Sequence, residues 1–256
     1  DRSVSRGLGD VYKRQEKYGI DTSDEAIRVA VEQHNEVCRL IRAIGDFRKE
    51  ANPRVTGYEF HILTLVSYVA PKHLIVDKLR ETLEEIKTRE PDAADKYRAR
   101  VVFVGSEVDD VDVIRLVEES GAYVCADRFC YGSLPGRDEI LLNDDEDVVK
   151  QVCRQVQGRA QCPRYWDMAK MTGRRDYVAD LAKEYGADGI IYEQMKFCDP
   201  WAYERMIGTI VLRDEHGYPV LAVDRPYSIG SSGQMRTCVQ AFVESIEIKK
   251  IQGGKK

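Results

Sequence analysis

Four short apolar runs in the second half of the chain constrain its fold most. They occupy residues 101–104, 123–126, 188–192 and 219–223, and segments with helical spacing of apolar positions separate or follow them. Strands that alternate with helices form a parallel sheet with helices on both faces. We therefore predict an α/β fold, in which residues 99–250 form a Rossmann-like parallel sheet flanked by helices.

The first part of the chain has a different pattern. Its apolar positions recur at helical spacing, which predicts helices over residues 23–50, from residue 56 onward and over residues 74–89. Ser23 is a suitable N-cap for the first of them. We expect a helical segment over residues 16–98 that precedes the sheet.

The two ends of the chain are expected to lie outside the fold. Residues 7–15 resemble a translated sequencing-adapter remnant, so residues 1–15 are treated as a non-native or disordered leader. On that interpretation the true N-terminal part of the protein is missing. Residues 251–256 are expected to form a frayed tail.

The composition excludes several classes of protein. The net charge of −5 gives no general attraction to nucleic acid or to anionic membranes. No apolar run approaches the roughly 20 residues of a membrane span, and no signal-peptide core is evident. We therefore expect a cytoplasmic protein. Seven cysteines, an odd number, argue against a disulfide framework.

Cys198 lies where a predicted strand ends and a helix begins. Asp199 is a suitable N-cap for that helix, and Pro200 suits its first turn. Ligands bind at this carboxyl edge in open α/β sheets, and a thiolate there gains from the helix dipole. The alternative is a small apolar residue buried beneath a loop, because free cysteine is among the most buried residue types.

Cys130 occupies the matching place after the preceding strand. Both cysteines would then lie at one edge of a parallel sheet and could converge. Thiolates in such a place suit an iron–sulfur cluster, although the spacing matches neither compact ferredoxin motifs nor zinc ribbons. We expect Cys38, Cys125 and Cys153 to be core residues.

A loop of small residues over 228–233 is a second candidate site. It precedes a predicted helix, whose free backbone N–H groups could meet an anion, with Arg236 nearby. A plain strand–helix turn is the alternative. The chain has no G-x-x-x-x-G-K-[ST] loop and no G-x-G-x-x-G after its first strand, which disfavours ATP-type and NAD-type domains. We expect neither NAD nor flavin.

Several motifs together resemble a known family. They cover residues 105–110, 126–133, 162–164, 188–201 and 233–242, in order, within a resemblance that runs from about residue 23 to 248. The most specific are Lys196-Phe197-Cys198-Asp199-Pro200 and the run Gly233-Gln234-x-Arg236-Thr237 with Ala241-Phe242. With these motifs the chain resembles subunits of 2-hydroxyacyl-CoA dehydratases and of the related ATP-dependent benzoyl-CoA reductases.

The resemblance implies a cofactor and its ligands. Family members hold a [4Fe–4S] cluster between two α/β domains with three cysteines per subunit. By motif, Cys130 and Cys198 correspond to two of these ligands, and the third is expected in the missing N-terminal domain. Cys162 lies in a matching motif and is a further candidate. Glu193, Ser231 and Gln234 are candidates for contact with substrate or cluster.

The resemblance also implies a mechanism and partners. One electron delivered to the thioester carbonyl of a (R)-2-hydroxyacyl-CoA makes a ketyl radical anion, which expels the 2-hydroxyl group. The β-proton then becomes acidic enough to leave, and the electron returns to the protein. Expected partners are the acyl-CoA substrate, a homologous second subunit and a separate ATP-dependent iron–sulfur activator.

Two alternatives stay open at this point. The chain could belong to a reductase of the benzoyl-CoA or double-cubane type, which would share Cys130 and Cys198. It could also be a non-catalytic electron-relay subunit whose partner holds the active cluster. A truncated chain of this kind could be inactive alone.

Overall fold

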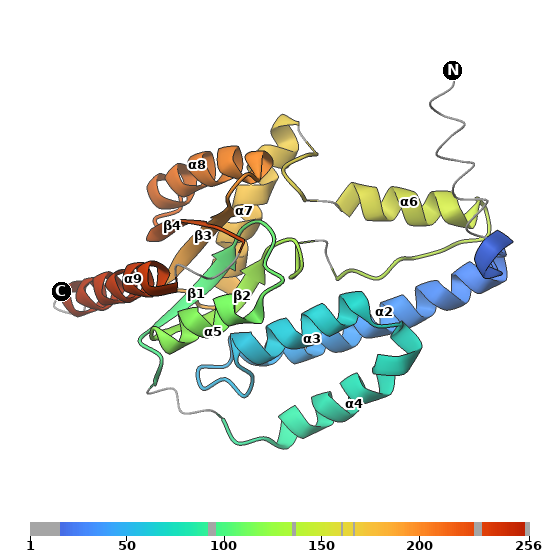
Figure 1. Ribbon diagram of the computed structural model, residues 1–256, viewed down its shortest axis with the longest axis horizontal. Coiled ribbons are helices and arrows are strands. Elements are labelled where there is room, and N and C mark those ends of the chain that lie inside the picture. Colours follow the sequence, from blue (N-terminus) through green and yellow to red (C-terminus); the bar gives the residue numbers. More distant parts are fainter. Residues whose placement is uncertain are drawn as a thin grey trace.

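The core of the protein is a four-stranded parallel sheet, ordered β2-β1-β3-β4 (Figure 1). The computed structural model describes residues 16–91, 96–134, 137–159, 161–165, 167–227 and 232–253. The strands are β1 (Ala99–Val104), β2 (Ala122–Arg128), β3 (Gly189–Met195) and β4 (Val220–Arg225). This architecture, with helices before and around the sheet, confirms the α/β prediction.

Successive residues of β1 face opposite sides of the sheet, as the pleat requires. Val101 and Phe103 join one buried cluster, whereas Val102 and Val104 join another. Residues of α5 and α9 complete the first cluster, and residues of α7 and α8 complete the second. The bounds of these helices are α5 (Val111–Glu119), α7 (Met168–Glu184), α8 (Asp199–Asp214) and α9 (Ser232–Gly253).

The helical segment has its own apolar core, lying beside β2 and α5 (Figure 1). The Ser23 hydroxyl accepts from the Ala26 N–H, as the sequence predicted. Thr56 and Glu59 form a capping box. The elements are α2 (Asp24–Asp46), the short 3₁₀ helix η1 (Phe47–Lys49), α3 (Gly57–Val69) and α4 (Lys72–Thr88).

Polar contacts fasten this segment to the sheet domain. The Glu118 carboxylate of α5 accepts from the backbone N–H groups of Gly57 and Tyr58, at 2.8 and 3.1 Å. Those groups open α3 and have no partner within the helix. The Tyr123 hydroxyl of β2 donates to the Val55 carbonyl at 2.7 Å. The two parts are therefore joined by directional bonds that are buried or half-buried.

His61 of α3 makes the stability of the fold depend on pH. Its ring is 2 % exposed, packs edge-on against Phe129 at 5.0 Å, and has no hydrogen-bond partner on either nitrogen among the described residues. Burial lowers the pKa of His61 to about 4. The unfolded chain binds this proton near pH 6.5, so the folded state loses stability as pH falls from 6.5 toward 4. We expect a loss of about 2 kcal/mol at pH 5 relative to pH 7.5.

Urea unfolding of wild type and His61→Phe at the two pH values measures this effect. Phenylalanine keeps the ring packing but cannot bind a proton. Between pH 7.5 and pH 5, the free energy of unfolding of the variant should therefore fall by about 2 kcal/mol less than that of the wild type. An equal loss in both proteins would show that His61 does not cause the acid sensitivity.

Two sequence predictions about cysteine and cap positions are wrong. Cys153 is exposed on α6 (Val148–Arg159), because that helix buries only Val148 and Gln151 and turns Cys153 away from them. The N-cap of α8 is Cys198, so Asp199 is the first residue of the helix. An acidic residue suits the first turn as well as the cap, which is why the sequence pattern placed the boundary one residue late.

Candidate functional site

Cys130 and Cys198 lie at the same edge of the sheet. Cys130 follows β2 by two residues, Cys198 follows β3 by three, and both side chains are half-buried against the cluster beneath α7 and α8. Parallel strands end at a common edge, so residues far apart in sequence meet there. The structure therefore brings these two predicted site residues to one region.

Ser106, in the loop after β1, ties the two cysteine loops together. Its carbonyl accepts from the Cys130 N–H at 3.0 Å. Its hydroxyl accepts from the Met195 N–H at 2.6 Å. The preceding residue must be glycine, because a Cβ on Gly105 would lie 2.5 Å from the Glu193 carbonyl oxygen. The loop after β1 thus sets the relative positions of Cys130 and Cys198.

Cys162, between α6 and α7, is the third half-buried cysteine of this region. Burial raises the pKa of the Cys130 thiol to about 11, and the neighbouring Cys162 and Cys198 thiols raise it further. Burial also raises the pKa of Cys198, again with a contribution from Cys162. The three thiols are close enough to feel one another's charge. A metal ion would have to displace their protons.

Trp201, in the first turn of α8, lies beside both sulfur atoms. Its ring is 2 % exposed, and within the part of the chain that the structure describes its indole N–H has no hydrogen-bond acceptor of good geometry. This N–H nevertheless lies close enough to Cys130 to lower the pKa of that thiol, and the Trp201 backbone N–H acts in the same way on Cys198. A buried donor without an acceptor is rare in folded proteins and calls for a partner.

Buried arginines surround the Cys162 loop. Arg174 and Arg175 of α7 both pair with Glu204 of α8, at 2.9 and 3.2 Å. Arg174 also donates to the Tyr165 carbonyl at 3.3 Å. Arg128, 2 % exposed at the end of β2, donates to the side chain of Gln161. Arg174 and Arg175 therefore share one buried carboxylate, and Arg128 has no carboxylate at ion-pair distance among the described residues, which favours negative charge nearby.

Phe197, the residue before Cys198, has an unusual conformation. Its φ is 71°, in the left-handed region, and its side chain is 97 % exposed. A bulky residue in that region costs roughly 1–2 kcal/mol. Such strain concentrates at functional sites, where the surrounding structure holds it in place.

Glu193, a predicted substrate-contact residue, is fully buried. Its carboxylate accepts from the Ser106 N–H at 3.0 Å and from the Ser106 hydroxyl at 2.9 Å. Arg225 Nε lies 2.8 Å from its other oxygen, at an angle too poor for a hydrogen bond, so that contact is an ion pair. Burial raises the pKa of Glu193, and Arg225 opposes that shift. Any effect of Glu193 on chemistry would act through these two neighbours.

The comparison with known families settles the relationship of the chain. The family model described as "2-hydroxyglutaryl-CoA dehydratase, D-component" matches residues 7–246. The chain belongs to this dehydratase family. All three half-buried cysteines lie within the matched residues.

Curated relatives agree with the family model. The chain is 26% identical over 230 residues to the (R)-phenyllactyl-CoA dehydratase beta subunit of Clostridium sporogenes, covering 89% of this chain and 59% of that protein. It is 25% identical over 237 residues to the beta subunit of (R)-2-hydroxyglutaryl-CoA dehydratase of Acidaminococcus fermentans, covering 91% and 60%. It is 22% identical over 235 residues to a benzoyl-CoA reductase subunit of Thauera aromatica, covering 90% and 59%. The chain thus spans about three-fifths of the length of these relatives.

Other predicted features of this dehydratase-family chain stay predictions. Ser231 lies outside the described residues, and Gln234 is exposed in the first turn of α9. Among the described residues, no group of three or more His, Cys, Asp or Glu side chains is arranged to hold a metal ion. The part of the chain that the structure describes also contains no helix with the length and apolarity of a membrane span.

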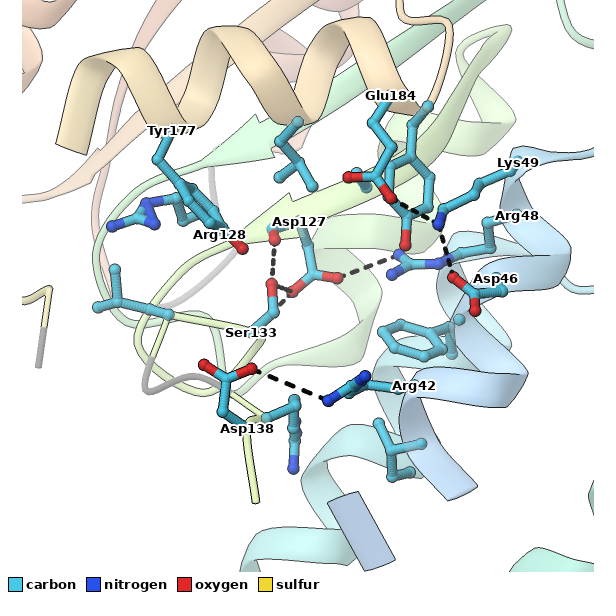
Figure 2. Close-up of a pocket in the computed structure, with 18 of the residues that line it drawn as sticks. Arg42, Asp46, Arg48, Lys49, Asp127, Arg128, Ser133, Asp138, Tyr177 and Glu184 are labelled. Carbon is cyan, nitrogen blue, oxygen red and sulfur yellow. Dashed lines mark hydrogen bonds and ion pairs between the residues drawn. The ribbon is translucent and has the colours of Figure 1, made fainter. Parts of the chain in front are cut away.

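A polar cavity between the helical segment and the sheet was missed by sequence reasoning (Figure 2). It measures about 380 Å³ and lies between α2, the end of β2 and α7. Arg48 of η1 crosses it to pair with Asp127 at 3.0 Å. The residues come from segments more than 100 positions apart in the chain, so no local motif signals the cavity. It contains none of the three half-buried cysteines.

Proposed function

We propose that this chain is an iron–sulfur subunit of a 2-hydroxyacyl-CoA dehydratase, which removes water from a (R)-2-hydroxyacyl-CoA. The observation that supports the proposal is the position of Cys130 and Cys198 after the ends of the parallel strands β2 and β3, within residues that match a dehydratase family. Cys162 lies near enough to raise the pKa of both thiols. Two of the relatives described above are named as dehydratase subunits, which supports the reaction class.

The surroundings of the cysteines fit a [4Fe–4S] cluster. The Trp201 indole N–H is a buried donor without an acceptor beside Cys130, and cluster sulfur atoms accept such bonds. The excess of buried guanidinium groups near Cys162 would offset negative charge on the thiolates. Cys130 and Cys198 would hold the cluster. The third cysteine is expected from an N-terminal domain beyond this chain, with Cys162 as the alternative.

Cys130 and Cys198 would hold the cluster, whose chemistry would be to lend the substrate one electron and take it back once the 2-hydroxyl group and the β-proton have left as water by way of a ketyl radical anion. The chain's own residues keep the site ordered for this step. Ser106 and Glu193 fix the two cysteine loops, and the buried Trp201 packs in the same cluster as both cysteines. A homologous second subunit and an ATP-dependent iron–sulfur activator complete the proposed system.

The test is activity of the whole protein, co-expressed with its neighbouring subunit and assayed anaerobically with 2-hydroxyacyl-CoA thioesters. Cys198→Ser should lower the rate by about 100-fold or more, because a cluster ligand is lost. The matched control is Cys238→Ser, since Cys238 is exposed on α9. Equal activity in Cys198→Ser and wild type would contradict a catalytic cluster here and favour a non-catalytic relay or scaffold subunit.

A reductase is the second candidate, because one of the relatives is a benzoyl-CoA reductase subunit. Product analysis separates the two. Dehydration is redox-neutral overall, so the electron donor would be needed only to start the reaction. A reductase would consume donor in proportion to product.

A further inference from the structure

We propose that the cavity between α2, β2 and α7 binds a phosphate-bearing small molecule. The inference starts from its charge. Six cationic side chains and four carboxylates line it, although the whole chain carries a net charge of −5. The cations are Arg42, Arg48, Lys49, Arg128, Arg137 and Arg159, and the carboxylates are those of Asp46, Asp127, Asp138 and Glu184.

All four carboxylates already have a cationic partner, and these partners are the three cations of α2 and η1. Lys49 pairs with Asp46 and Glu184 at 2.8 and 2.6 Å. Arg48 pairs with Asp127 at 3.0 Å, and Arg42 lies 3.8 Å from Asp138. Figure 2 shows Arg42, Arg48 and Lys49 reaching from α2 and η1 toward these carboxylates. The four carboxylates of the cavity are thus all paired with cations of α2 and η1.

The other three arginines have no carboxylate at ion-pair distance within the described residues. Arg128 donates to the side chain of Gln161 and stacks over the Tyr177 ring, 4.4 Å from its centroid. Arg159 donates to neutral oxygens, among them the carbonyls of Asp138 and Glu139 at 2.8 and 2.7 Å. Arg137 donates to the Ser67 hydroxyl at 3.1 Å.

Two of these three guanidinium groups, those of Arg128 and Arg137, lack a partner for their charge or for one of their donors. Arg128 is 2 % exposed, and burial lowers its pKa to about 10, which reflects the free energy of keeping an unpaired cation there. One terminal nitrogen of Arg137, Nη2, is buried and has no hydrogen-bond partner among the residues that the structure describes. A buried donor of this kind lacks an acceptor that an oxyanion would provide.

The chemistry of the lining suits an oxyanion such as phosphate. Guanidinium forks match the paired oxygens of a phosphate group better than any other basic side chain does. Phe60, Tyr177 and Tyr185 add aromatic surface to the same cavity. A volume of about 380 Å³ admits a small organic phosphate as well as the free ion. This inference does not rest on the proposed function, because the cavity includes no candidate cluster ligand.

Calorimetric titration tests the inference with two probes, inorganic phosphate and adenosine 3′,5′-bisphosphate, a nucleotide with phosphates in common with coenzyme A. The titration uses the purified chain in sulfate-free buffer at constant ionic strength. Equal affinity for both probes supports recognition of the phosphate group alone. Tighter binding of the nucleotide supports an organic phosphate as the ligand. Binding of neither probe overturns the inference.

Two variants locate the binding. Arg137→Gln and Arg159→Gln change half-buried residues and keep a donor at each position, so both should fold. Each should weaken phosphate binding about tenfold or more, because a charge-assisted hydrogen bond is lost. The control is Arg213→Gln, which removes an exposed charge on α8 that pairs with Asp214. Equal weakening in all three variants, or in none, would show that the cavity does not hold the phosphate. The measurement needs no iron, so its outcome is independent of the cluster.

Discussion

Glu193→Ala is expected to lower the free energy of unfolding by roughly 3–5 kcal/mol, because it leaves a buried charge without its partner. Arg225, whose side chain is 6 % exposed, would lose the ion pair with Glu193. Two donors of Ser106 would lose their acceptor as well. The loss should be visible as a shift of the urea midpoint with little change in slope.

The control for this variant is Glu146→Ala, since Glu146 is paired with Arg154 on the exposed surface of the protein. Exposed ion pairs contribute little to stability, so no measurable shift is expected there. Equal small shifts in both variants would show that the Glu193 contacts do not hold the loop after β1.

Arg48→Met is expected to have a similarly large effect, again roughly 3–5 kcal/mol. Arg48 is 4 % exposed, pairs with Asp127 and stacks 3.5 Å from the centroid of the Phe60 ring. Methionine keeps part of the apolar contact but strands the buried Asp127 carboxylate, leaving it with the Ser133 donors. Thermal or urea unfolding measures the loss.

Arg80→Met serves as the comparison for this second variant. Arg80 pairs with Asp77 and Glu36 on the exposed side of the helical segment, and its removal should change stability little. If Arg48→Met were as stable as Arg80→Met, the link between η1 and β2 would not support the fold.

The sequence predicted the architecture because its strand signals are local. Short apolar runs such as Ile190-Ile191 and Val101-Val102 identify buried parallel strands without knowledge of their neighbours. Thr56 likewise indicates the start of a helix, because its own side chain caps the helix N-terminus. These signals need only a few adjacent residues.

Features that depend on packing between elements could not be predicted from such local signals. The exposure of Cys153 depends on how α6 packs, which its own spacing does not state.

The candidate site was likewise predictable only in part. The place of Cys130 and Cys198 at one sheet edge follows from the rule for parallel strands, and the structure confirms that placement. The unpartnered indole N–H of Trp201 and the arginines near Cys162 could not be predicted from the sequence. Both features depend on which partners a side chain lacks in the folded structure.

The most direct test of the central claim is the iron and acid-labile sulfide content of the whole protein, purified anaerobically with its neighbouring subunit. We expect about four irons per subunit in wild type and in Cys238→Ser, with marked loss in Cys130→Ser and Cys198→Ser. About eight irons would point to a double-cubane relative and make Cys162→Ser the next variant. Iron content that is unchanged in both Cys130→Ser and Cys198→Ser, or absent from wild type, would contradict the assignment of these cysteines as cluster ligands.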